Sequence, residues 1–267
     1  MSALTRATTN TAACRNLRKS GFSIRKLTER QPKMTGSDRC VALLPMKANS
    51  QRVKGKNFRM LHGKPLFAWI LDSMLALPEI DRVIINTDAR DILAENGLVE
   101  GGRVVIRDRR ADLCGDTVSM NRILADDIAA CPSDMYLMTH TTNPMLVPET
   151  IRAATLAYRA GVVAGTADSL FTVNKFQTRF YRADGSAVNH DPDNLIQTQD
   201  LEPWYEENSC LFIFSKDSFA ATNARIGRKP ILFPMSKLEA VDIDTPEDWA
   251  IAEAFAGHSL AQKSAAE

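Results

Sequence analysis

From residue 41 onward, short apolar runs alternate with longer stretches in which apolar residues recur at helical spacing. The short runs indicate strands that are buried on both faces, because a continuous apolar run leaves no face for solvent. The predicted strands are residues 41–45, 82–86, 103–106, 134–139 and 210–214. The predicted helices are residues 65–77, 89–95, 117–130, 148–158 and 246 to about 255. Strands that alternate with helices in this way predict an α/β fold with a doubly wound, mainly parallel sheet.

The alternation breaks at residues 171–205, a polar stretch that we call the arm. Turn signals at residues 183–185 and 191–194 predict a hairpin rather than another strand–helix unit. An irregular insertion of this size in a compact domain usually has a function or reaches a partner. After the arm, residues 230–234 and 240–243 are expected to close the domain, with Thr245 and Pro246 starting the last helix. Residues 258–267 are expected to fray, so the predicted domain spans residues 38–257.

The composition predicts a soluble globular protein. Of the 267 residues, 45% are hydrophobic and 24% are charged, which are ordinary values for a chain with a sizeable core. No apolar run approaches the roughly 18 residues of a membrane-spanning helix, so no membrane segment is expected. The five cysteines are scattered without a CxxC pair. They favour reduced thiols in the cytoplasm and argue against structural zinc.

The first 33 residues differ from the rest in charge. They hold eight of the 33 basic residues and one of the 32 acidic ones, which leaves 25 basic and 31 acidic residues for the rest of the chain. We expect residues 1–37 to be a disordered or non-native leader, with Met34 as an alternative start, although a basic, acid-poor leader is also typical of a transit peptide. Because the remainder is acidic, a nucleic-acid partner is not expected.

A basic loop follows the first predicted strand. Among its small and amide residues, which include Ser50 and Asn57, it carries four cations, Lys47, Arg52, Lys54 and Lys56. In α/β proteins, backbone N–H groups and cations converge where such a loop leaves the sheet, and there they hold phosphate groups. The loop matches neither the Walker A nor the GxGxxG pattern. A solvated basic loop is the alternative interpretation.

Two carboxylates near the end of the chain are candidate metal ligands. Asp242 and Asp244 lie two residues apart in VDIDT, so on an extended segment their side chains share a face. Carboxylate oxygens suit Mg²⁺, which often bridges to a substrate phosphate. In the alternative interpretation, Asp244 only flanks the following helix and Asp242 is solvated.

Further candidates follow other predicted strands, where ligands of open α/β sheets gather. Asp88, Arg107 and the turn at residues 139–143, with His140 inside it, are placed in this way. The aromatic and acidic run at residues 204–208 precedes a strand and is a candidate for lining a substrate pocket. Asp88, Arg107 and the turn are equally compatible with ordinary loop polarity. His140 is also compatible with a hydrogen-bonded structural histidine, and residues 204–208 with a segment that only covers the core.

Taken together, these segments resemble the acylneuraminate cytidylyltransferase family (CMP-sialic acid synthetases), which activate acidic sugars. The resemblance covers about residues 41–255. The family's opening IPAR-x-x-S-K-x-x-x-x-KN is matched by LPMKANSQRVKGKN, with Lys47 at the arginine, and its IDIDT, which holds magnesium, by VDIDT. Five further family segments are matched in the same order along the chain. STD is matched by residues 86–88, RP by 107–108, L-x-x-D-T by 113–117, LQPTSP by 138–144 and N-G by 208–209.

The resemblance implies a nucleotide-diphospho-sugar-transferase-like, Rossmann-type sheet and a homodimer formed through the arm. It implies Mg²⁺-dependent transfer of CMP from CTP to a sialic acid-like sugar with release of pyrophosphate. The implied catalytic residues are Lys47, Lys56, Asp242 and Asp244, the aspartates as metal ligands. The implied nucleotide-binding residues are Lys47, Ser50, Lys56, Asn57, Asp88, Arg107, Asp116 and Thr117. The implied acceptor-binding residues are His140, Asn143, Arg179, Tyr205 and Asn208.

Several positions depart from the family pattern. Lys47 keeps the charge of the family's arginine but loses its bidentate fork, and Gln51 stands at the first lysine of the loop. His140 replaces a glutamine that faces the sugar, and Thr198 stands where an arginine reaches the sugar carboxylate. The acceptor is therefore left open between a sialic acid, 3-deoxy-manno-octulosonate, another nonulosonic acid and a phosphonate such as 2-aminoethylphosphonate. A catalytically silent nucleotide-binding homologue is the alternative from another class, and the intact aspartate pair argues against it.

Overall fold

The computed structural model describes residues 40–48 and 53–266, with side chains as far as residue 261. The described residues all lie within one compact unit. The predicted leader and residues 49–52 of the basic loop, Ser50 and Gln51 among them, lie outside the described residues. In the described part of the chain, no helix combines the length and the apolar character that crossing a membrane requires.

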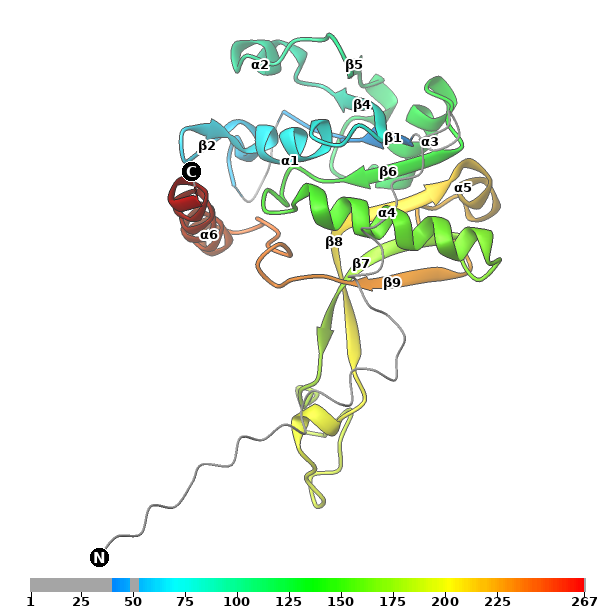
Figure 1. Ribbon diagram of the computed structural model, residues 1–267, viewed down its shortest axis with the longest axis vertical. Coiled ribbons are helices and arrows are strands. Elements are labelled where there is room, and N and C mark those ends of the chain that lie inside the picture. The colour runs from blue at the N-terminus through cyan, green and yellow to red at the C-terminus, as the bar shows by residue number, and fades with distance from the viewer. Residues whose placement is uncertain (1–39, 49–52, 267) are drawn as a thin grey trace, which may run out of the picture. The chain divides into compact units, whose positions relative to one another are not determined.

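A seven-stranded sheet lies at the centre of the unit, in the order β5-β4-β1-β6-β8-β7-β9 (Figure 1). Its strands are β1 (Cys40–Leu43), β4 (Ile80–Thr87), β5 (Val104–Asp108), β6 (Met135–Thr139), β7 (Ser169–Phe176), β8 (Trp204–Ser215) and β9 (Pro230–Pro234). β8 is antiparallel to both of its neighbours, and the other neighbouring pairs are parallel. The predicted mainly parallel α/β sheet is confirmed. A separate hairpin pairs β2 (Met60–Leu61) with β3 (Lys64–Pro65).

β1 is buried on both faces, as its apolar sequence predicts. Because side chains alternate along a strand, Val41 and Leu43 point into one hydrophobic core and Ala42 into the other. One core packs against α1 (Leu66–Leu75) and α4 (Pro148–Val163), and the other against α3 (Met120–Ala130) and α5 (Lys216–Thr222). Helices on both faces make the sheet doubly wound.

The helices form where apolar residues recur at helical spacing. In α1, Phe67, Ile70, Leu71 and Met74 are fully or almost fully buried and form one apolar stripe. α2 (Arg90–Glu95) is short, and α4 extends five residues beyond its predicted end at residue 158. α3 begins at Met120 rather than at residue 117. The later start follows from Ser119, whose extended backbone (φ −67°, ψ 145°) makes it the N-cap.

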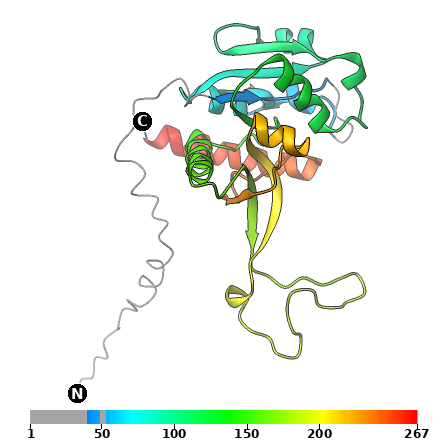
Figure 2. The ribbon, with the colours of Figure 1, turned by 90° about the vertical axis from the view of Figure 1, so that its right-hand side faces the viewer.

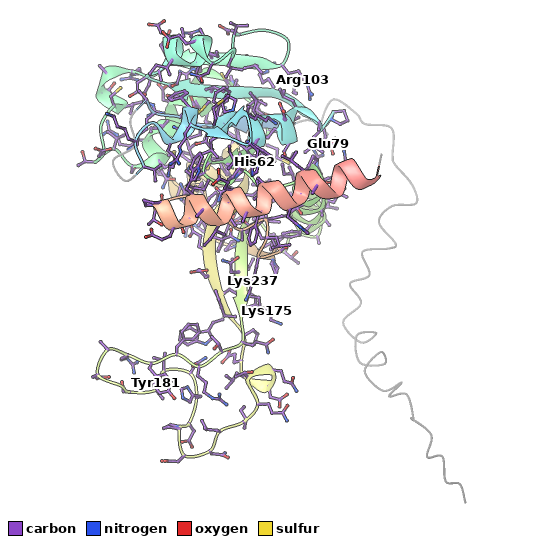
Figure 3. The ribbon with its side chains drawn as sticks, turned by 90° about the vertical axis from the view of Figure 1, so that its left-hand side faces the viewer. His62, Glu79, Arg103, Lys175, Tyr181 and Lys237 are labelled. Carbon is purple, nitrogen blue, oxygen red and sulfur yellow. The ribbon has the colours of Figure 1, made fainter. Side chains whose placement is uncertain are left out.

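The arm grows directly out of the sheet. β7 and β8 remain paired as far as Phe176 and Trp204, and the hairpin that they form projects beyond the other strands (Figure 2). β8 therefore begins six residues before the predicted start at Cys210, because residues 204–207 pair with β7. The ring of Phe180 stacks on that of Trp204 at 5.2 Å between centroids. Figure 3 shows Lys175 at the root of the hairpin and Tyr181 farther out in the arm.

The last helix is longer than its sequence pattern predicts. α6 (Pro246–Ala266) continues past residue 255, where the sequence pattern predicted its end, and fraying of residues 258–267 stays a prediction. Alanine-rich sequence favours this extension. Trp249, Ala252 and Ala256 pack into a third apolar cluster with Leu61 of β2. In Figure 3 the helix passes His62, whose ring nitrogen lies 2.7 Å from the Glu253 carbonyl oxygen.

Residues 240–243 form no strand. They continue as extended chain, and the Ile243 N–H donates to the Thr142 carbonyl over 3.0 Å. Ile243 is fully buried among the residues of the third cluster. The segment is therefore fixed by its apolar side chain and one backbone bond, and it places Asp242 and Asp244 beside the turn after β6.

Candidate active site

The candidate site lies at the carboxyl ends of the central parallel strands. Lys47, Asp88 and His140 follow β1, β4 and β6, which are neighbours in the sheet. Asp88 accepts a hydrogen bond from the Ala48 N–H over 2.7 Å. Ligands of open α/β sheets bind at this edge, where neighbouring loops diverge. The topology therefore brings together residues that are 40 or more positions apart in the sequence.

Lys56 and Asn57 join the basic loop to the rest of the site. Gly55, with a left-handed φ of 62°, turns the loop into the short 3-10 helix η4 (Lys56–Phe58), and both side chains are buried. The Lys56 ammonium donates to the Ile243 carbonyl and lies 3.2 Å from an Asp244 oxygen. A buried ammonium requires such partners because it has lost its hydration. Lys56 thus ties η4 to the VDIDT segment.

Asn57 holds two other segments in place. Its amide donates to the Lys47 carbonyl over 2.9 Å, and its side-chain oxygen accepts from the Thr141 hydroxyl over 2.6 Å. The Lys47 ammonium pairs with Asp116 at 2.6 Å. Both partners of this pair are about half exposed, so it is open to exchange with a charged ligand. Thr117 beside Asp116 is exposed.

Asp242 and Asp244 are suited to holding a metal ion. One oxygen of Asp242, Oδ1, is buried and has no hydrogen-bond partner among the described residues. Burial raises the pKa of Asp242, its hydrogen bond with Thr142 lowers it, and the charge of Asp244 raises it again. A buried carboxylate oxygen without a donor is the ligand that a hard cation requires. In the described residues, no group of three or more His, Cys, Asp or Glu side chains could hold a metal, so substrate oxygens would have to complete the coordination.

Thr245 starts α6 as predicted. Its hydroxyl and backbone N–H both bond to the Asp248 carboxylate at 2.8 Å, and the Asp248 N–H donates back to the hydroxyl over 3.2 Å. This reciprocal pattern is a capping box. The Asp244 N–H also donates to Asp248, over 3.0 Å. The helix cap thus fixes the backbone that carries the aspartate pair.

Arg109, rather than the predicted Arg107, contacts the chain next to the basic loop. Arg107, predicted to bind the nucleotide, pairs instead with Asp126 at 2.8 Å and with the fully buried Asp127. Arg109 reaches the site: its Nη2 donates to the Met46 carbonyl over 2.8 Å and to the Asn86 carbonyl over 2.7 Å. Burial lowers the pKa of Arg109. Both arginines follow the same strand, so the sequence carries no signal that separates them.

The residues predicted to bind the acceptor lie in two places. His140 follows β6, and its pKa falls to about 4 because it is buried and the charges of Arg225 and Lys56 act on it. Asn143 donates to Cys210 Sγ over 3.1 Å, and its oxygen is buried without a partner among the described residues. Arg179 is in the arm, where it donates to the Ile196 carbonyl over 2.6 Å, and Tyr205 is exposed at the root of the arm. Within this chain, Arg179 is therefore not brought to the sheet edge.

Asn208 is held at an irregularity of β8. The pairing shifts between Phe171 and Val173 of β7, and Ser209 has a left-handed φ of 56°. The Thr172 hydroxyl donates to Asn208 over 2.7 Å and accepts from the Leu211 N–H over 3.0 Å. β-Bulges near active sites redirect side chains. This bulge fixes Asn208 next to the end of β6.

The comparisons with known proteins agree with this geometry. A family model described as cytidylyltransferase matches residues 41–265. A CMP-N,N'-diacetyllegionaminic acid synthase of Legionella pneumophila is 29% identical over 228 residues, which cover 80% of this chain and 95% of that protein. An N-acylneuraminate cytidylyltransferase of Streptococcus agalactiae is 23% identical over 234 residues, 84% of this chain and 55% of that protein, so the chain spans about half the length of that relative.

Two solved structures share the fold. A CMP:2-keto-3-deoxy-manno-octonic acid synthetase in complex with CTP superposes with a TM-score of 0.57 at 13% identity, covering 83% of this chain and 99% of that chain. A 4-diphosphocytidyl-2C-methyl-D-erythritol synthase from Anaerococcus prevotii gives a TM-score of 0.59 at 14% identity, covering 82% and 97%. The match of the family model over most of the sequence, on a sheet of this type, shows that the chain belongs to the cytidylyltransferase family.

Proposed function

We propose that the protein transfers CMP from CTP to an acidic, sialic acid-like sugar and releases pyrophosphate, with Mg²⁺ as the metal. The observation that carries the proposal is the meeting of Lys56 with the aspartate pair, in which one oxygen of Asp242 is buried without a donor. A cation and two carboxylates at the carboxyl edge of the sheet suit a metal-bound triphosphate. The names of the Legionella and Streptococcus relatives support an acidic sugar as the acceptor.

The chain's own residues would act by positioning and by neutralising charge, which is what phosphoryl transfer requires. Lys47 and Lys56 would bind phosphate oxygens, with Lys47 exchanging its pairing with Asp116 for the ligand. Asp242 and Asp244 would hold Mg²⁺, which would bind phosphate oxygens and stabilise the developing negative charge. Asn57 would keep the loop in register through its bonds to Lys47 and Thr141.

The acceptor would bind beyond β6. His140 is neutral at pH 7 because its pKa is about 4, so it would act as a hydrogen-bonding group and not as a cation. The unpartnered oxygen of Asn143 would accept from an acceptor hydroxyl. Asn208, fixed by Thr172, would provide a further polar contact.

The arm supports a homodimeric arrangement. It carries exposed apolar side chains, Tyr181, Leu195 and Ile196, and a projecting hairpin of this kind suits pairing with a second subunit. In such a dimer, Arg179 of one subunit would lie over the acceptor site of the other. The scattered cysteines favour a cytoplasmic location with reduced thiols.

Two alternatives differ in the acceptor or in the chemistry. A cytidylyltransferase for 3-deoxy-manno-octulosonate or a phosphonate would bind the nucleotide with the same residues. His140, which stands where the family has a glutamine that faces the sugar, favours such a different acceptor. A silent nucleotide-binding homologue would not need the aspartate pair. The unpartnered oxygen of Asp242, a stability cost that a metal would relieve, argues for catalysis.

The test is pyrophosphate release from CTP and Mg²⁺ with a panel of acceptors. The panel contains N-acetylneuraminate, a legionaminate-type sugar, 3-deoxy-manno-octulosonate and 2-aminoethylphosphonate, with ATP, GTP and UTP as controls. Release with an acid sugar supports the proposal, and release with the phosphonate alone replaces the acceptor. Asp244→Ala should reduce turnover at least about 100-fold while CTP binding stays measurable. CTP binding without release for any acceptor would contradict the proposal.

A further inference from the structure

Arg225 is a partly buried cation that the sequence motifs do not include. It lies in the loop after α5, and its side chain is 19% exposed. Its guanidinium lies over the ring of Phe212, 4.1 Å from the centroid. Phe212 of β8 pairs with Met138 of β6, two residues before His140. The fold thus places the guanidinium beside the end of β6, at the acceptor side of the site.

The surroundings of Arg225 leave its charge poorly matched. Among the described residues, one carboxylate, that of Glu207, comes within ion-pair distance, at 3.6 Å, and this carboxylate is 39% exposed. A guanidinium has five N–H donors in a planar fork. Burial lowers the pKa of Arg225, and Glu207 raises it. A desolvated cation with one loose partner costs folding free energy, which is typical of a group whose full partner is a ligand.

The residues around Arg225 are consistent with the binding of an anionic group of the acceptor. The charge of Arg225 and that of Lys56 both lower the pKa of His140, so both cations lie near that residue. The backbone N–H of Arg225 is held by Asn121 of α3 at 3.4 Å, and Glu207 precedes Asn208 at the bulge of β8. The guanidinium therefore lies near both His140 and the bulge that holds Asn208.

We propose that Arg225 binds the oxyanion of the acceptor, a carboxylate or a phosphonate, and so selects anionic acceptors within this same chain. The inference rests on the proposed function and assigns its acceptor specificity to a residue outside the family's motifs. The planar fork binds two oxygens at once, whereas a lysine at this position would offer a single point charge. The incoming oxyanion would replace the loose contact with Glu207.

The first measurement is binding. The acids of the panel are titrated calorimetrically into the protein with Mg²⁺ and an α,β-methylene analogue of CTP, which does not react. The wild type should bind one acid, and Arg225→Gln should weaken that binding about 10- to 100-fold, the effect of one lost hydrogen bond to a charged group. Whether the bound acid is a sugar carboxylate or the phosphonate identifies the source of the oxyanion.

The second measurement separates binding from folding. With CTP and Mg²⁺, Arg225→Gln should raise the acceptor KM by the same factor and leave the CTP KM within about twofold, and Arg225→Lys should fall between the two. Arg228→Gln, an exposed cation of the same loop, is the matched control and should leave both KM values unchanged. A purely structural role predicts a lower melting temperature for Arg225→Gln with the acceptor KM unchanged.

The outcomes for the two proposals are distinct. Equal affinity of wild type and Arg225→Gln for the acid overturns the role of Arg225 and leaves the cytidylyltransferase proposal standing. No binding of any acid in the panel by the wild type also overturns it. Binding of an acid that is weakened in Arg225→Gln, without pyrophosphate release from authentic CTP, supports the oxyanion site and contradicts the proposed reaction.

Discussion

The guanidinium of Arg109 donates to the Met46 carbonyl over 2.8 Å and thereby ties the chain after β5 to the chain after β1. The same side chain also donates to the Asn86 carbonyl and to its side-chain oxygen, at 2.7 and 2.9 Å. The Asn86 amide in turn donates to the buried Asp127 over 2.8 Å. One arginine therefore satisfies the backbone acceptors Met46, just before the basic loop, and Asn86 of β4.

We expect Arg109→Ala to destabilise the protein by about 2–4 kcal/mol, because it leaves several partly buried acceptors without donors. Since these acceptors support the nucleotide loop, the CTP KM should rise more than the acceptor KM. Urea unfolding and steady-state kinetics measure the two effects. Arg110→Ala, which removes a 63% exposed neighbour, is the control. A change in unfolding free energy equal to that of the control would contradict the account.

His140 predicts a specific pH dependence. Its pKa is about 4 in the folded protein, below the value near 6.5 of an unfolded chain. As the pH falls from about 6.5 to 4, the unfolded chain takes up a proton that the folded protein does not, so this group lowers the stability at about 1.4 kcal/mol per pKa unit. The unfolding free energy of the wild type minus that of His140→Gln should therefore fall over this range. A difference that is constant with pH would show that His140 is not buried in the neutral form.

Asp242→Asn should lower the activity without lowering the stability of the protein. The substitution removes a buried charge whose oxygen has no donor, so the metal-free variant should be as stable as the wild type or more so. Turnover should fall at least about 100-fold because a metal ligand is lost. Melting curves with and without Mg²⁺ and CTP provide the measurement: the wild type should gain stability from the ligands and the variant should gain little. An equal gain in both proteins would remove Asp242 from the metal site.

The packing of Trp249 should fix the position of the two aspartates. Trp249 is 3% exposed and shares its apolar cluster with Ile243, the residue between the two aspartates. Trp249→Ala should destabilise the protein by about 3–5 kcal/mol and lower turnover by displacing the VDIDT backbone. Ile251→Ala, at a 47% exposed position of the same helix, is the control. Lost stability with normal turnover at low temperature would show that the cluster does not position the aspartates.

The sequence alone predicts the sheet well, because β1 and β6 are apolar runs that can only be buried strands. It predicts the position of Asp242 and Asp244 for a similar reason, since VDIDT precedes a recognisable helix cap. It does not predict the roles of Arg107 and Arg109. Both follow the same strand, and only packing against Asp127 and Met46 decides which one faces the loop. Arg225 was missed because its significance depends on Phe212 and Glu207, which are distant in the chain.

β8 has a mechanical consequence for the protein. A single unbroken strand passes from the arm at Trp204, through the bulge that holds Asn208, to the sheet beside β6. We therefore expect a displacement of the arm to reach Asn208, at the proposed acceptor site, more directly than it reaches the basic loop after β1. Changes that loosen the arm should accordingly degrade discrimination between acceptors and leave discrimination between nucleotides intact.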